Sequence, residues 1–147
     1  SASTTETKRE RNMPKDMDRL IVREEERDWE IWQDEELKQA CPVYWKTLTD
    51  GENSGAGNVV TGIFVVREGG TFLRHFHPQQ EIYNVLSGRG RLTIDSESRE
   101  VQAGTTVLIP GNARHCLENI GDGELRVFYI FSAPSLSEVD YHFVDFE

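Results

Sequence analysis

Two histidines and a glutamate lie close together near the middle of the chain. If residues 72–77 form a strand, side chains alternate between its two faces, so His75 and His77 point the same way. The Pro-Gln-Gln that follows is typical of a turn, and Glu81 then begins a second predicted strand. Two imidazoles and one carboxylate are therefore predicted to face one another.

Neutral imidazoles and a carboxylate form a mixed nitrogen and oxygen ligand set. Such a set suits a divalent transition metal, namely iron, manganese, nickel, zinc or copper. Three or four protein ligands also leave coordination positions open for a substrate, which indicates chemistry rather than structural support. A fourth ligand is expected downstream, where His115 follows a Pro-Gly-Asn turn at the start of another predicted strand.

These two segments resemble the two sequence motifs of the cupin superfamily. The first motif, G-x5-H-x-H-x3-E-x6-G, matches at all its fixed positions, and the second, G-x5-P-x-G-x2-H-x3-N, matches at all but one. The second departs at Asn112, where the family usually has glycine, but asparagine tolerates a positive φ better than other residues with a side chain. The matching residues are Gly69, His75, His77, Glu81, Gly88, Gly104, Pro110, His115 and Asn119. The resemblance implies one metal ion held by His75, His77, Glu81 and His115.

The predicted fold class is all-β, a single-domain cupin (jelly-roll β-barrel) with an N-terminal helical or irregular extension. Short runs rich in β-branched residues alternate with turn residues through the second half of the chain. We expect residues 1–16 to be a disordered tail, residues 17–57 to be an extension that packs on the barrel, and residues 58–147 to form the barrel itself. Within the extension, the run DEELKQA favours a helix that Pro42 ends.

Composition limits the class of partner. The 147 residues include 16 Lys and Arg against 26 Asp and Glu, a formal net charge of −10. A chain of this length forms one domain, and its negative charge argues against binding to nucleic acid or to an anionic membrane. No apolar run approaches the length of a membrane span, so a small molecule is the expected partner. The two isolated cysteines suggest a cytoplasmic protein, and the cupin resemblance implies a homodimer.

Two tyrosines are candidates for catalysis. Tyr83 shares the predicted strand face of Glu81, and Tyr141 lies in the C-terminal run SEVDYHFVDFE. A phenol close to a cation loses its proton more easily and can then serve as general base. Each tyrosine could instead be a core residue with a satisfied hydroxyl. Trp45 also has two possible roles. It could pack on the barrel, or it could line the mouth of a pocket.

The arrangement resembles the short cupin lyases that split dimethylsulfoniopropionate into dimethyl sulfide and acrylate. In that family one tyrosine follows the metal-binding glutamate by two residues and another lies in the C-terminal segment, so the matching residues are His75, His77, Glu81, His115, Tyr83 and Tyr141. The resemblance implies a metal-dependent lyase or isomerase that acts on a small carboxylate or carbonyl substrate. Its metal is a Lewis acid and a tyrosine is the general base. Two alternatives stay open, a non-haem iron(II) dioxygenase and a sugar-modifying or small-molecule-binding cupin.

Overall fold

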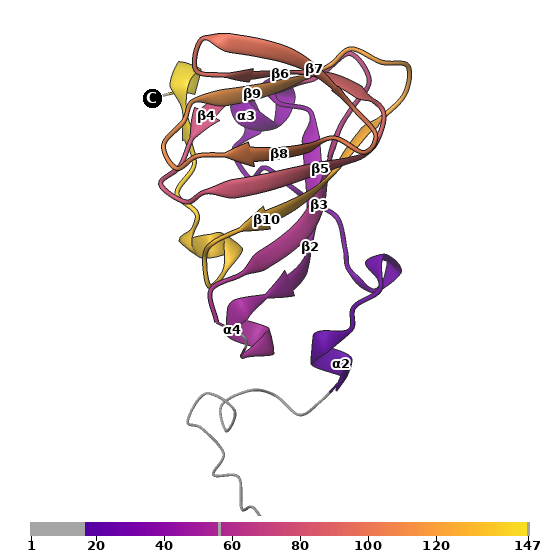
Figure 1. The fold of residues 1–147 in the computed structure, drawn as a ribbon, viewed down its shortest axis with the longest axis vertical. Helices are drawn as coiled ribbons and strands as arrows, with labels where there is room; N and C mark the ends of the chain where they lie inside the picture. The colour runs from indigo at the N-terminus through magenta and orange to yellow at the C-terminus, as the bar shows by residue number, and fades with distance from the viewer. Residues whose placement is uncertain (1–16, 56, 147) are drawn as a thin grey trace, which may run out of the picture.

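The computed structural model describes residues 17–55 and 57–146 as two antiparallel sheets packed face to face (Figure 1). The six-stranded sheet has the order β1-β2-β3-β10-β5-β8, and the five-stranded sheet has the order β11-β4-β9-β6-β7. This confirms the all-β jelly-roll prediction. The expected disordered tail, residues 1–16, lies outside the described residues.

The six-stranded sheet consists of β1 (Glu30–Ile31), β2 (Val43–Asp50), β3 (Val60–Val66), β10 (Leu125–Phe131), β5 (Glu81–Ser87) and β8 (Thr106–Ile109). The five-stranded sheet consists of β11 (His142–Phe143), β4 (Thr71–Phe76), β9 (His115–Asn119), β6 (Arg89–Ile94) and β7 (Glu97–Gln102). The short helices are α2 (Met17–Leu20), α3 (Glu35–Ala40) and α4 (Gly51–Ser54), with 3-10 turns η1 (Glu24–Glu26), η2 (Leu136–Glu138) and η3 (Val144–Phe146). No helix in the described ranges is long and apolar enough to cross a membrane.

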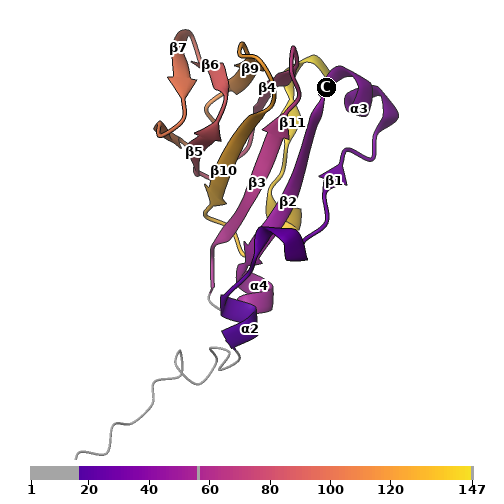
Figure 2. The same cartoon turned by 90° about the vertical axis from the view of Figure 1, so that its right-hand side faces the viewer.

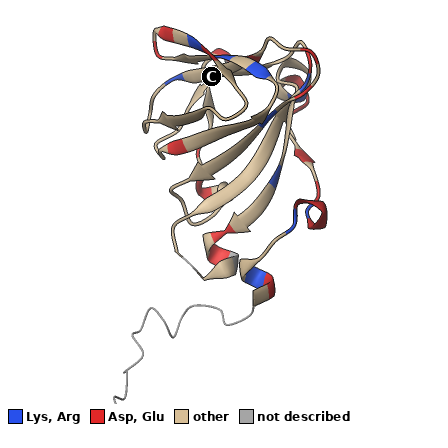
Figure 3. Ribbon diagram, turned by 45° about the vertical axis from the view of Figure 1, so that its right-hand side comes forward, with Lys and Arg blue, Asp and Glu red and all other residues tan. Residues whose placement is uncertain are grey.

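Strand alternation builds the core between the sheets. In β10, Leu125, Val127, Tyr129 and Phe131 are buried, whereas the residues between them are half-exposed. Because the side-chain period of a strand is two, every second residue faces the interior. Charged residues are sparse on the long central strands and frequent toward the two ends of the molecule (Figure 3).

The segment expected as a helical or irregular extension contains both a helix and a full sheet strand. Helix α3 begins after Asp34, whose carboxylate accepts a hydrogen bond from the Leu37 amide at 2.9 Å, and Pro42 follows it. Strand β2 is not predicted by the sequence analysis, yet it pairs along β3 (Figure 2). Its sequence, VYWKTLTD, lacks a clear alternation of apolar and polar residues because both of its faces are partly covered.

Residues before β1 contact the outer face of β2 and the side chain of Arg126 on β10. The Trp29 ring packs edge-on against Tyr44, with 4.7 Å between ring centroids, and the Lys46 ammonium lies 4.1 Å above the Trp29 ring. The Glu24 carboxylate forms ion pairs with both Lys46 and Arg126. This cover explains why Lys46, whose side chain would otherwise be exposed, is buried.

The outer face of β10, β5 and β8 carries a row of apolar residues. Ile130 pairs with Ile82, and Ile82 pairs with Leu108, whose exposed fraction is 60%. Such a row suits contact with another copy of the chain. The structure describes a single chain, so the expected homodimer stays a prediction that sedimentation analysis would check.

Asn119, the last fixed residue of the second motif, has a structural role. Its side-chain amide donates to the Val66 carbonyl at 3.0 Å and to the Gly123 carbonyl at 2.8 Å. Its side-chain oxygen accepts from the Gly121 amide at 3.1 Å. This buried side chain therefore ties the end of β9 both to β3 and to the following turn.

We predict that Asn119→Asp lowers the free energy of unfolding by about 2 kcal/mol or more, because a carboxylate cannot donate to the two buried carbonyls. Thermal and urea unfolding measure the loss. The matched control is Asn84→Asp, whose amide donates to the Thr106 hydroxyl on the outer face and whose loss should cost about 0.5 kcal/mol or less. Equal stability of the two variants would contradict this role for Asn119.

Candidate metal centre

The predicted ligands converge from three strands of both sheets. His75, near the end of β4, pairs directly with His115 at the start of β9. His77 follows β4, and Glu81 begins β5 in the opposite sheet. The exposed fraction is 1% for each of the three histidines and 3% for Glu81. The cluster therefore lies inside the barrel, between the sheets.

Two turns hold the ends of these strands together. The Asn112 amide donates to the His77 carbonyl at 2.7 Å, and Asn112 has the predicted positive φ, 65°. A Cβ atom on Gly111 would lie 2.3 Å from the Pro78 carbonyl oxygen, so this close approach needs glycine. The turn before His115 thus packs against the turn after His77, which fixes the two imidazoles relative to each other.

The donor atoms lie within reach of a single ion. One ring nitrogen from each of His75, His77 and His115 lies within 4.8 Å of the others. The Glu81 Oε1 atom lies 3.2 Å from His77 Nε2 and 3.7 Å from His115 Nε2. The three imidazoles therefore form the compact group, and the carboxylate lies beside two of them.

Backbone hydrogen bonds orient all three rings in the same way. Each Nδ1 lies beside a carbonyl oxygen, at 2.7 Å for His75, 2.8 Å for His77 and 2.8 Å for His115. A carbonyl can only accept, so each Nδ1 carries the proton and donates it. The Nε2 atoms are then left with free lone pairs. This is the usual way in which the surroundings of a metal-binding histidine fix its tautomer and orientation.

Burial keeps His75 from binding a proton instead. It holds the pKa of His75 well below its usual value, and the neighbouring charge of protonated His115 or His77 would lower that pKa further. His75 is therefore neutral at physiological pH, the form that binds a metal.

A cation fits the groups that are present. Within the described residues, the Nε2 atoms of His75, His77 and His115 and the Oε1 atom of Glu81 are buried without a hydrogen-bond partner. The Glu81 carboxylate faces imidazole lone pairs, an arrangement that is repulsive unless positive charge lies between them. A divalent transition metal would satisfy all four atoms at once.

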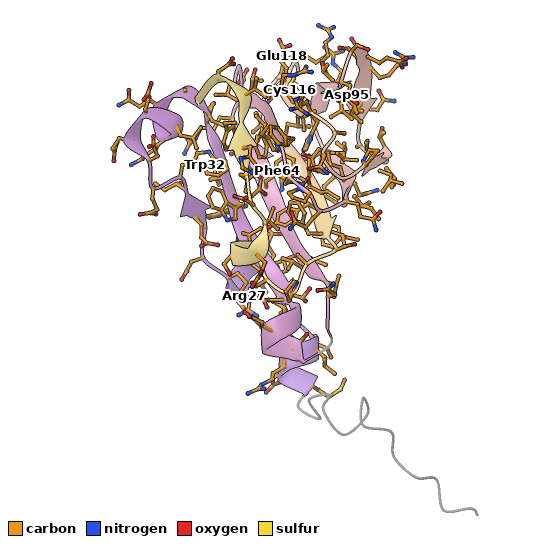
Figure 4. All side chains as sticks on the ribbon, turned by 90° about the vertical axis from the view of Figure 1, so that its left-hand side faces the viewer. Arg27, Trp32, Phe64, Asp95, Cys116 and Glu118 are labelled. Atoms are coloured by element: carbon orange, nitrogen blue, oxygen red, sulfur yellow. The ribbon has the colours of Figure 1, made fainter. Side chains whose placement is uncertain are left out.

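A cavity of about 430 Å³ reaches this cluster at Glu81 and Tyr141. Its volume is in the range of small-molecule sites. Six of its fourteen lining residues are aromatic, namely Trp32, Trp45, Phe64, Phe72, Tyr129 and Tyr141. Trp32 and Phe64 lie among the interior side chains between the N-terminal segment and the sheets (Figure 4). A cavity that can hold a small molecule therefore lies next to the candidate metal-binding residues.

The structure places both candidate tyrosines near the cluster. The ring centroid of Tyr83 lies 5.1 Å from that of Phe64 and 6.2 Å from that of His115. The ring centroid of Tyr141 lies 5.5 Å from those of both His75 and His77. Burial, and then the charge of Glu81, raises the pKa of each phenol well above its usual value. Tyr141 belongs to the cavity wall, whereas Tyr83 lies behind it among aromatic rings.

Other residues of the cavity wall were not identified from the sequence. Trp45 lines the cavity, as one of its two interpretations from the sequence expected. Trp32 and Tyr129 also line it, but the sequence did not identify them. Alternation within the predicted strand ELRVFYIFSA could have placed Tyr129 on the inner face. Trp32 belongs to the N-terminal extension, and its side chain packs against Trp45 and Phe72 of the barrel. Local sequence patterns do not encode such a contact.

Fold and site together define a small β-barrel protein with a buried cluster of three imidazoles and one carboxylate beside an aromatic cavity. The family model described as the cupin domain matches residues 62–131. An uncharacterised protein of Streptomyces coelicolor is 34% identical over 77 residues, which cover 52% of this chain and 72% of that protein. The chain belongs to the cupin superfamily.

Two further proteins show how this chain relates to named enzymes. The dimethylsulfoniopropionate lyase DddW of Ruegeria pomeroyi is 35% identical over 101 residues, which cover 69% of this chain and 66% of the lyase. A solved structure of the oxalate decarboxylase of Bacillus subtilis has a TM-score of 0.59 and 24% identity, covering 69% of this chain and 28% of that chain. The decarboxylase shares the fold, and both relatives extend well beyond the matched part.

We predict that the double variant His77→Ala/His115→Ala no longer retains a divalent metal, because two of four donors are removed. The protein is equilibrated with one equivalent of Fe(II), Mn(II), Ni(II) or Zn(II) and desalted, and bound metal is then measured by mass spectrometry. The control is His142→Ala, which changes the remaining histidine, 3.0 Å from the Asp140 carboxylate, and should keep the metal. A full equivalent retained by the double variant would defeat the assignment.

Proposed function

We propose that this protein is a metal-dependent lyase that acts on a small carboxylate bearing an onium group, in the manner of a dimethylsulfoniopropionate lyase. In this proposal His75, His77, Glu81 and His115 hold one divalent transition metal. The observation that carries the proposal is the composition of the cavity beside the cluster. The named relative DddW, matched over 69% of this chain, supports the same class of substrate.

The cavity wall favours a positively charged ligand. Six aromatic rings contribute to it, along with the carboxylates of Glu30 and Glu81, and among its described residues there is no lysine or arginine. Aromatic faces attract cations through the ring quadrupole, and quaternary onium groups are well suited because they are poorly hydrated. An onium group would therefore be bound by the ring faces of Trp32, Phe64 and Phe72, while the carboxylate end of the substrate would turn toward the cluster.

When bound, a divalent metal supplies positive charge that polarises the substrate carboxylate and favours ionisation of a nearby phenol. The residues of the chain then carry out an elimination. The Tyr141 Oη, in the cavity wall, removes the proton on the carbon next to the carboxylate. The electron pair of that C–H bond forms the new double bond, the bond from carbon to sulfur breaks, and a neutral dialkyl sulfide leaves with its electron pair.

Tyr83 has a different position and is assigned a supporting role. It is buried beside His115 and Glu81, behind the cavity wall. Its hydroxyl can orient the carboxylate of Glu81 or assist the ionisation of Tyr141, whose charge contributes to raising the pKa of Tyr83. The two phenols therefore act as one coupled pair in this proposal, with Tyr141 as the base.

We predict that Tyr141→Phe lowers kcat for sulfide release by about 10²-fold to 10⁴-fold, the usual loss on removing a positioned base. Tyr83→Phe should lower kcat as well, while both variants keep the metal. Turnover is followed by headspace gas chromatography of dimethyl sulfide from dimethylsulfoniopropionate, with the metal-loaded protein under anaerobic conditions. The control is Tyr44→Phe, whose hydroxyl donates to Glu124 at the surface.

Anaerobic conditions separate the lyase from the dioxygenase alternative, because an elimination consumes no O2. Near-normal turnover by Tyr141→Phe would reject tyrosine as the base. Failure of the unmodified protein to release sulfide with any of the four metals would reject the lyase.

A further inference from the structure

We propose that Trp45 and Tyr129 form an oxygen-binding subsite in the cavity, in which the indole N–H and the phenol O–H donate to one carboxylate oxygen of the substrate. The other oxygen of that carboxylate faces the histidine cluster. The inference rests on the proposed function only in taking a small carboxylate as the ligand. It assigns a role to two residues that the metal site and the general base leave unused.

Both residues carry a buried donor that lacks a partner. Trp45 Nε1 and Tyr129 Oη have no hydrogen-bond partner among the described residues, and both residues line the same cavity. The exposed fraction of Tyr129 is only 3%. Buried donors are nearly always paired in folded proteins, so two unpaired donors beside one cavity point to a ligand that completes them.

The strand register places the two residues on the same part of the six-stranded sheet. Trp45 and Thr47 lie two residues apart on β2, and Thr47 pairs with Gly62 on β3, which in turn pairs with Tyr129 on β10. The Thr47 side chain lies near the phenol and partly offsets the rise that burial causes in the pKa of Tyr129. A hydrogen bond of acceptable geometry does not join them, so the phenol still lacks an acceptor.

Gly62 makes room for the ring of Tyr129. A Cβ atom at position 62 would lie 2.3 Å from the Tyr129 hydroxyl oxygen and 2.4 Å from the ring carbon that bears it. The ring therefore lies across β3 where only a glycine lets it pass. Any side chain at this position would push the phenol from its place between β2 and β10.

A carboxylate is the ligand group that fits. It offers about four lone-pair sites on two oxygens, so one oxygen can accept from two donors while the other stays free. Tyr129 also lies close to the cluster, because it is one pleat repeat, about 7 Å, from Phe131, which pairs with Glu81. In this inference one small carboxylate contacts both the donors and the cluster.

Indole NMR signals provide a test that needs no turnover. The chain has three tryptophans, so the 15N-labelled, metal-loaded protein gives three indole N–H signals, and that of Trp45 is assigned by its loss in Trp45→Phe. Trp32 is an internal control, since it lines the same cavity but its Nε1 already donates to the Cys41 carbonyl at 3.2 Å. The probe is propionate, a small carboxylate without an onium group.

We expect propionate to shift the Trp45 signal downfield in a saturable way and to leave the Trp32 signal nearly unchanged. Trp45→Phe and Tyr129→Phe, which keep the rings, should each raise the Kd for propionate by about tenfold or more, the effect of losing a hydrogen bond to a charged group. Tyr44→Phe should leave that Kd unchanged. The signals of the unmodified protein give a result even if a variant fails to fold.

The inference is overturned if propionate does not bind, if it binds while the Trp45 signal stays in place, or if both variants bind it as the unmodified protein does. The proposed function fails separately. Propionate binding through the two donors without sulfide release would reject the lyase and keep the subsite. Sulfide release by the unmodified protein, together with an unchanged Kd for propionate in both Trp45→Phe and Tyr129→Phe, would keep the lyase and reject the subsite.

Discussion

Three hydrogen bonds from imidazole N–H groups to backbone carbonyls control the rest of the site. The carbonyls of Leu73, Gln79 and Ala113 each accept from the Nδ1 of a histidine two residues away. Because each proton is held at Nδ1, each Nε2 keeps a lone pair in the buried interior. The local backbone thus orients the three imidazoles for metal binding without the help of a metal. Folding also holds three lone pairs close to a carboxylate that they would otherwise repel.

The two-sheet architecture gives this cluster its position. Three histidines come from the five-stranded sheet or the turn after it, whereas Glu81 comes from the six-stranded sheet, so sheet packing closes the site. The N-terminal segment adds Glu30, Ile31, Trp32 and Gln33 to the cavity wall. Trp29 anchors this segment on the outer face of β2, and the side chain of Trp32 packs against Trp45 in the cavity wall. A segment that looks peripheral in the sequence therefore forms part of the cavity wall.

Strand alternation predicts local features well and long-range features poorly. It places His75, His77, Glu81 and Tyr83 on inner faces correctly, because each assignment depends only on neighbouring residues. The positive φ of Asn112 follows from its side chain for the same reason. Tyr141 could be identified only through a family resemblance, since nothing local brings a C-terminal residue to the cluster. Alternation in β10 could also have placed Tyr129 on the inner face. Strand β2 and Trp32 depend on pairing and packing between distant segments, which no local pattern encodes.

We expect the three Nε2 atoms and the Glu81 carboxylate to bind a single metal ion. Anomalous diffraction from crystals loaded with Co(II), recorded on both sides of the cobalt absorption edge, locates such an ion. We predict one strong anomalous peak, within bonding distance of His75, His77 and His115 and of one Glu81 oxygen, with open positions toward the cavity. A cluster without a peak in loaded crystals, or a peak that lacks two or more of these four ligands, would contradict it.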